Sequence, residues 1–276
     1  MKRYIITGCS RSGTSVTHNA LKGHPNVSAL NDEVLIEPYF NMGLSTFTHG
    51  RNLKIENEKG FQAIFDAICS IGANEDTEYI GLKTSLYYYP IYAKYVTSAL
   101  EKYFPNIKVI ITYRKDTVAQ YGSWIRARKT GQYHSWNKKD KKLLHPIKLN
   151  KYQYIKQLLD NLDFMEELRN LKLTHDVLEF SYEDDICKGN FYKLFDFLKI
   201  PYYELDWLNS KKVAPSPKKY IKNYNHLSRL TKTINTLYSN GNGIEKYQRI
   251  RSRVNFYNSL KRKTKKFMKI ISANNI

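Results

Sequence analysis

One short segment constrains the fold of this 276-residue chain more than any other: residues 8–15, with the sequence GCSRSGTS. A β-rich run precedes it at residues 3–7, and residues 13–21 have the spacing of a helix that ends near Gly23. In a glycine loop between a strand and a helix, backbone N–H groups converge, and the helix N-terminus adds about half a unit of positive charge. The segment therefore predicts an anion-binding turn after the first strand.

Strand-like and helix-like segments alternate along the rest of the chain. The strand-like runs are residues 79–82, 109–113 and 175–180. The helical patterns are residues 61–71, 90–103, 116–129, 151–171 and a segment that Asp184 or Asp185 opens and that continues to residue 198. The run 109–113 is continuously apolar, as in a parallel strand buried on both faces. This alternation predicts an α/β fold, a single domain resembling the phosphate-loop proteins with a central parallel sheet flanked by helices.

The net charge of +20 is unevenly distributed. Residues 211–276 carry 17 lysines and arginines against one acid, whereas residues 1–210 are nearly balanced. We therefore expect an α/β domain at residues 1–226 and a basic helical C-terminal extension at residues 227–276, packed on the domain or trailing from it.

The cysteines and the N-terminus indicate where the protein works. Cys9, Cys69 and Cys187 are far apart and odd in number, which favours a reducing compartment over a disulfide framework, and their spacing fits no zinc pattern. The chain has no apolar stretch long enough for a signal peptide or a membrane span. We expect a cytoplasmic protein.

The loop departs from the nucleotide-triphosphatase pattern at one position, because Thr14 stands where that pattern has a lysine. It keeps its hydroxyl residues and carries a cation inside the loop, Arg11. In these features it resembles the 5′-phosphosulfate loop of sulfotransferases that use 3′-phosphoadenosine 5′-phosphosulfate (PAPS) and release adenosine 3′,5′-bisphosphate (PAP). The resemblance implies an enzyme that needs no metal. It also implies a set of residues that bind the donor's 5′-phosphate and bridging oxygen: Arg11, Ser12, Gly13, Thr14 and Ser15.

Residues 109–116, followed by Ser123, resemble the second signature of this family. There, a buried strand ends in a basic residue, a serine follows about two helical turns later, and the two groups hold the 3′-phosphate. The usual interval is eight residues. Lys115 lies eight residues before Ser123 and Arg114 lies nine before it, so both remain candidates.

Two later segments also resemble the family. Residues 178–185, LEFSYEDD, look like its late strand and Tyr-Glu-Asp turn, whose role is mainly structural. Residues 216–223 resemble the loop that closes over the donor, which implies that Lys218 or Lys219 reaches the 3′-phosphate. Because two prolines stand among lysines in residues 209–226, we expect an ordered or substrate-gated loop there rather than a helix.

In-line sulfuryl transfer needs a base for the acceptor proton and cations near the bridging oxygen. Cytosolic relatives use the histidine of a Lys-Thr-His-Leu segment, but residues 83–86 of this chain read Lys-Thr-Ser-Leu. Glycan-directed relatives use a glutamate after the first helix. The resemblance therefore implies Glu33 as the general base, with Asp32 and Glu37 as alternatives. Lys83, at the end of a strand, is a candidate contact for the transferring sulfonate or for the acceptor.

Residues 116–136 resemble the bacterial glycolipid sulfotransferases that modify trehalose-like sugars. The resemblance implies that Tyr133, His134 and Trp136, together with Asp32, bind the acceptor, with the aromatic rings stacking on sugar faces. We expect a carbohydrate or glycolipid hydroxyl as acceptor. A lipid-linked sugar, a small metabolite and a peptide tyrosine remain open.

Two other functions are alternatives. A nucleotide kinase or triphosphatase needs a loop lysine and an acidic magnesium ligand at a strand end, where this chain has Arg114 and Lys115. A nucleic-acid- or membrane-binding protein would use the basic C-terminus. There, residues 258–276 combine six basic residues with a cluster of four apolar ones. This composition favours peripheral contact with an anionic inner membrane face over nucleic-acid binding, and a solvated helix end that only aids solubility is the alternative.

Overall fold

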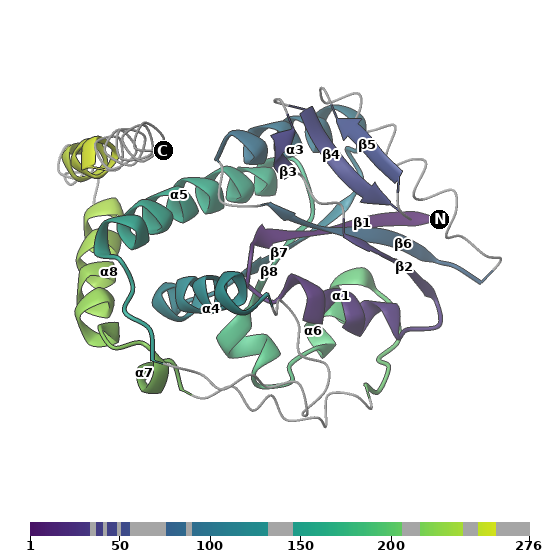
Figure 1. Cartoon of the computed structure of the whole chain (residues 1–276). Helices are drawn as coiled ribbons and strands as arrows, with labels where there is room; N and C mark the ends of the chain where they lie inside the picture. Colours follow the sequence, from purple (N-terminus) through teal and green to yellow (C-terminus); the bar gives the residue numbers. More distant parts are fainter. Residues whose placement is uncertain are drawn as a thin grey trace, which may run out of the picture. The chain divides into compact units, whose positions relative to one another are not determined.

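The computed structural model of the chain describes residues 1–33, 37–40, 43–48, 51–55, 76–86, 90–131, 146–205, 216–239 and 248–257. The chain divides into two compact units. Unit 1 consists of Met1–Asp116 and Asn161–Val213, and unit 2 consists of Thr117–Asp160 and Ala214–Ile276. Figure 1 shows the elements of both units.

A five-stranded parallel sheet forms the centre of unit 1 (Figure 1). In spatial order its strands are β2 (Val27–Glu33), β6 (Tyr79–Leu86), β1 (Lys2–Cys9), β7 (Lys108–Tyr113) and β8 (Val177–Ser181). All four pairings between neighbours are parallel. This architecture confirms the predicted α/β fold. Because the strands are parallel, their carboxyl ends meet at one edge, where the loop after β1 lies between those after β6 and β7.

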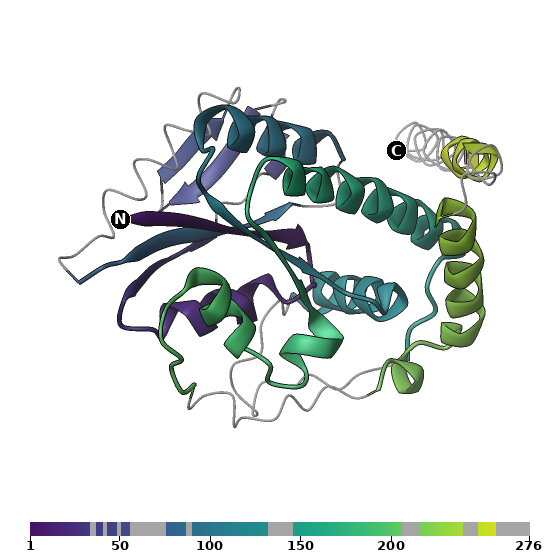
Figure 2. The same cartoon turned by 180° about the vertical axis from the view of Figure 1, so that it is seen from behind.

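Helices cover both faces of this sheet. Helices α1 (Thr14–Lys22) and α6 (Tyr192–Leu198) lie on one face, and α3 (Pro90–Tyr103) lies on the other (Figures 1 and 2). The second half of α5 (Lys151–Asn170), continued by the 3₁₀ turn Leu171–Leu173, joins the core under α3. Successive β1 residues alternate between the two cores: Ile5 packs with the α3 side, whereas Tyr4 and Ile6 pack with the α1 side.

A second, antiparallel sheet was not predicted. It consists of β3 (Glu37–Phe40), β4 (Gly43–Thr48) and β5 (Arg51–Ile55), in the order β3-β4-β5. The edge strand β2 of the main sheet was not predicted either. These strands are four to seven residues long and mix apolar with polar residues, so none of them contains the sustained apolar run on which a strand prediction depends.

The helix expected from Asp184 or Asp185 to residue 198 is wrong, because two separate elements occupy this stretch. A short π-helical turn, Tyr182–Ile186, comes first, and α6 begins only at Tyr192. Gly189, with φ +73°, lies between them in the left-handed conformation, which no helix continues. Ser181 caps the N-terminus of the π-helical turn, because its Oγ accepts a hydrogen bond from the Asp184 N–H at 3.3 Å.

Unit 2 is helical. It contains α4 (Thr117–Thr130), the first half of α5, α7 (Pro217–Tyr220), α8 (Tyr224–Ser239) and a helical segment at residues 248–257. The Tyr154 hydroxyl of α5 lies 2.9 Å from Thr117 Oγ1 and also hydrogen-bonds Thr231 Oγ1, so this buried side chain ties α4, α5 and α8 together.

Helices α7 and α8 correct the expectation of a loop at residues 209–226, in the part of it that the structure describes. Pro217 stands in the first turn of α7, where its missing N–H costs no helical hydrogen bond. The prolines therefore start a helix instead of preventing one. Helix α8 begins two residues before position 226, and the division of the chain there remains a prediction.

Three sequence predictions lie outside the described residues: the helix at 61–71, the aromatic acceptor segment and the basic tail at 258–276. No helix in the described ranges is both long and apolar enough to cross a membrane.

Candidate active site

The loop at residues 8–15 joins β1 to α1 at the carboxyl edge of the sheet, as predicted. Arg11 (φ +67°) and Gly13 (φ +104°) both adopt left-handed backbone conformations on either side of Ser12. Left-handed residues in such a turn bring successive N–H groups to one side and build an anion-binding concavity. Gly13 is also the N-cap of α1, so the positive end of the helix dipole lies at this concavity.

Position 13 requires glycine for two reasons. A side chain at φ +104° is strained, and a Cβ there would lie 2.3 Å from Ile186 Cδ1 of the π-helical turn. The neighbouring Cys9 thiol is buried, and burial raises its pKa, which keeps it protonated and unsuited to act as a nucleophile.

A buried hydroxyl pair fastens the loop to β7. Ser12 Oγ and Thr112 Oγ1 lie 2.7 Å apart, and both side chains are fully buried. The Thr112 hydroxyl also donates to the Thr7 carbonyl oxygen at 3.4 Å. The backbone approaches closely here too, because a Cβ at Gly8 would lie 2.3 Å from the Thr112 carbonyl oxygen. Thr112 therefore contacts the beginning and the middle of the loop.

Lys83 reaches the other end of the loop from β6. Its side chain is buried, and its Nζ donates a hydrogen bond to Ser15 Oγ at 3.0 Å. In the sheet register Lys83 lies between Ile6 of β1 and Glu33 of β2. The sheet thus brings Lys83 to the predicted loop. It also places the backbone of Glu33, the candidate base, beside that of Lys83.

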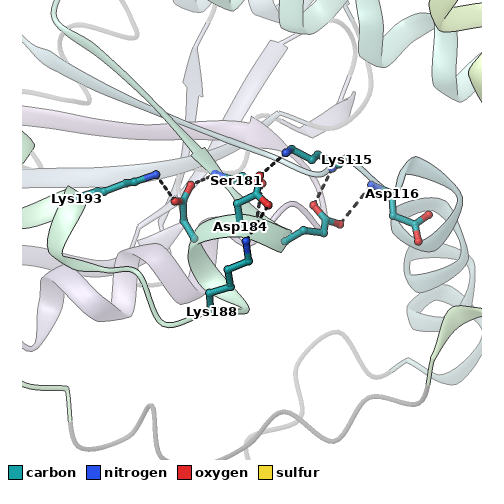
Figure 3. A network of polar contacts seen from close by, with 8 residues as sticks. Lys115, Asp116, Ser181, Asp184, Lys188 and Lys193 are labelled. Carbon is teal, nitrogen blue, oxygen red and sulfur yellow. Dashed lines mark hydrogen bonds and ion pairs between the residues drawn. The ribbon is translucent and has the colours of Figure 1, made fainter.

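The two candidates for the second phosphate follow β7 and pair with acids. Figure 3 shows the pair that Lys115 makes. Arg114 Nε lies 3.3 Å from Glu183 Oε1, and its guanidinium lies 4.2 Å from the centroid of the Tyr182 ring. The Lys115 ammonium pairs with Asp184. The hydrogen bond between them raises the pKa of Lys115 and lowers the pKa of Asp184. Both cations therefore have a carboxylate partner.

Comparison with known proteins decides the class of this site. The model of the sulfotransferase family matches residues 4–204. The chain belongs to the sulfotransferase family. The matched region of this sulfotransferase includes the loop, Lys83 and the two cations after β7.

Three solved structures are similar to this sulfotransferase. The sulfotransferase from Alicyclobacillus acidocaldarius has 14% identity and a TM-score of 0.48, over 79% of this chain and 89% of that one. The sulfotransferase domain from the curacin biosynthetic pathway has 15% identity and a TM-score of 0.40, over 75% and 77%. The sulfotransferase domain of the Synechococcus PCC 7002 olefin synthase has 14% identity and a TM-score of 0.43, over 85% and 94%. No curated protein sequence matches the chain significantly.

The binding and catalytic roles of all the predicted site residues of the sulfotransferase stay predictions. Ser123 lies in α4 and the exposed Lys218 and Lys219 lie in α7, all in unit 2, whereas Arg114 and Lys115 belong to unit 1. Asp32 lies in β2 and Glu37 begins β3, and the side chains of both and of Glu33 lie outside the described residues. Three candidate acceptor contacts lie entirely outside the described residues: Tyr133, His134 and Trp136.

Two residues of the site were missed by sequence reasoning. Thr112 is the one aliphatic hydroxyl in the apolar run of β7, and a buried hydroxyl needs a hydrogen-bond partner, so its position was a usable signal. Glu183 was predicted to have a structural role in the turn after β8. Its contacts with the loop after β7 were missed because they depend on the pairing of β7 with β8.

Proposed function

We propose that this sulfotransferase transfers a sulfuryl group from PAPS to a hydroxyl of a carbohydrate or glycolipid. The bond between sulfur and the bridging phosphate oxygen breaks, a bond from sulfur to the acceptor oxygen forms, the acceptor proton passes to a protein carboxylate, and PAP leaves. The observation that carries the proposal is the contact of the buried Lys83 ammonium with Ser15 at the end of the anion-binding loop. A cation there can stabilise the negative charge that grows on the bridging oxygen.

The loop suits the 5′ end of such a donor. Its two left-handed residues and the N-terminus of α1 supply N–H groups and a partial positive charge, and Arg11 adds a full one. The donor's 3′-phosphate is assigned to Arg114 or Lys115 with Ser123, and Lys218 or Lys219 closes over it. Two separated basic sites match a donor with two phosphate groups.

We assign the base role to Glu33, with Asp32 and Glu37 as the alternatives. The register of β2 against β6 supports this choice, because Glu33 is the residue of β2 beside Lys83. A carboxylate near a bound sulfate has its pKa raised by the like charge, which suits it to accept a proton near neutral pH. Tyr133, His134, Trp136 and Asp32 are assigned to the sugar acceptor.

Calorimetry with two nucleotides tests the donor class. PAP should bind far more tightly than AMP, because AMP lacks the second phosphate. Equal affinities would remove the second phosphate site from the proposal. Sulfate transfer from PAPS to a panel of sugar and glycolipid acceptors should also proceed in excess chelator, whereas ATP turnover that requires magnesium would identify a kinase.

A further inference from the structure

A single carboxylate organises the segment that follows β7. Glu183 Oε2 accepts a hydrogen bond from the Lys115 N–H at 2.8 Å, and Oε1 accepts one from the Asp116 N–H at 3.3 Å. Oε1 also lies 3.3 Å from Arg114 Nε. Three consecutive residues are thus held by one side chain that comes more than 65 residues later in the chain. Figure 3 shows the two backbone contacts, which reach the labelled Lys115 and Asp116 from the turn after β8.

The turn that carries Glu183 is itself braced. The carboxylate of Asp185 is buried, accepts a hydrogen bond from the Ser181 N–H at 2.7 Å and pairs with Lys193 Nζ at 2.6 Å (Figure 3). The Tyr182 ring packs under the Arg114 guanidinium, and burial raises the pKa of Tyr182 to about 12, so the ring stays neutral. Glu183 therefore projects from a fixed support.

The neighbouring carboxylate makes a different kind of contact. Asp184 pairs with the ammonium group of Lys115 and, at 3.5 Å, with that of Lys188. These are partly exposed pairs between side chains, and pairs of that kind contribute little to stability. Asp184 thus carries the same charge as Glu183 and is its neighbour in the chain. Its carboxylate contacts lysine side chains, whereas that of Glu183 contacts the backbone of the segment after β7.

We infer that Glu183 is a positioning residue for the 3′-phosphate site. It fixes the backbone of residues 115 and 116 by hydrogen bonds and holds the Arg114 side chain by an ion pair, so that the cations are in place before the donor binds. This inference rests on the proposed function, in which Arg114 or Lys115 binds that phosphate. A carboxylate near a phosphate also repels it, so positioning and simple charge have opposite effects on affinity.

The test uses this difference in sign. Glu183→Gln and Asp184→Asn each remove one negative charge from the same turn, and PAP and AMP binding to the full chain is measured by calorimetry. We expect Glu183→Gln to weaken PAP binding roughly tenfold, the size of one charge-assisted hydrogen bond, and to leave AMP binding within about twofold. Asp184→Asn should leave PAP binding unchanged or strengthen it.

Three results would overturn the inference. They are PAP binding to Glu183→Gln that is as tight as in the wild type, an equal loss of PAP and AMP affinity, and an equal loss of PAP affinity in Asp184→Asn. If Glu183→Gln does not fold, Glu183→Asp keeps the charge but draws the carboxylate back by one methylene; it should lose preference for PAP, and full preference would refute the role. A wild type that binds PAP and AMP equally would instead refute the proposed donor site itself.

Discussion

The hydroxyl oxygens of Ser12 and Thr112 lie 2.7 Å apart, and neither side chain is exposed. This pair joins the anion-binding loop to the strand that leads to Arg114 and Lys115. The Thr112 hydroxyl also reaches the Thr7 carbonyl oxygen at 3.4 Å, on the strand that enters the loop. One threonine therefore fixes both the loop backbone and the orientation of a loop hydroxyl.

Replacing Thr112 tests this connection. Thr112→Val keeps the shape of the side chain but leaves the buried Ser12 hydroxyl without its partner, so the free energy of unfolding should fall by about 1–3 kcal/mol. Thr112→Ser keeps the hydroxyl and is the matched control. Urea denaturation of both variants measures the effect, and equal stability of Thr112→Val and Thr112→Ser would contradict it.

Gly13→Ala should damage the loop in two separable ways. The added methyl group meets Ile186 Cδ1, and the left-handed backbone is strained for alanine. We expect a loss of about 1–3 kcal/mol in the free energy of unfolding. Adding Ile186→Val removes the clashing methyl and should restore only part of the loss, because the backbone strain remains. Full restoration by the second substitution would show that the conformation of residue 13 does not matter.

Glu33→Gln tests the assignment of the base. The substitution keeps size and hydrogen bonding but removes proton affinity, so turnover should fall by roughly 10²–10⁴-fold while PAP binding changes little. The comparison variants are Asp32→Asn and Glu37→Gln. Near-normal turnover in Glu33→Gln, together with a large loss in one of the other two, would transfer the role to that residue.

Lys83→Met should lower turnover strongly, because it removes the buried cation at Ser15 while keeping most of the apolar volume. Lys108→Met is a matched control in the same sheet. Lys108 stands at the amino end of β7, away from the loop, and its Nζ lies 3.1 Å from Asp176 Oδ2. Steady-state kinetics should show a loss in the first variant alone. Equal losses in both would mean that Lys83 acts through general stability.

Glu179 predicts how stability depends on pH. Burial on its own raises the pKa of this carboxyl, but hydrogen bonds from Arg169 and Lys172 outweigh it and leave the pKa below the ordinary 4.5. The stabilisation is therefore complete above pH 4.5 and is lost as the pH falls through the lower pKa of the folded state. Thermal unfolding of wild type and Glu179→Gln should differ at pH 7 and converge in acid; a constant difference would contradict this linkage.

The sequence predicts those parts of the fold that local signals specify. The apolar run of β7 and the glycines of the loop are patterns that span only a few residues. They identify β1, the loop, α1 and β7. Strand β2 ends in polar residues and exists through its pairing with β6, which no local pattern specifies. The contacts of Glu183 with residues 115 and 116 likewise depend on β7 and β8 being neighbours.

Thr112, which touches the anion-binding loop, and Arg114, a candidate for the second phosphate, stand two positions apart at the end of β7. A strand advances about 3.3 Å per residue, so their backbone positions are separated by about 7 Å. In the proposed function the loop that Thr112 fastens binds the 5′-phosphate and Arg114 is a candidate for the 3′-phosphate, so we expect a regioisomer that carries its second phosphate on the 2′-oxygen to bind more weakly although its charge is identical.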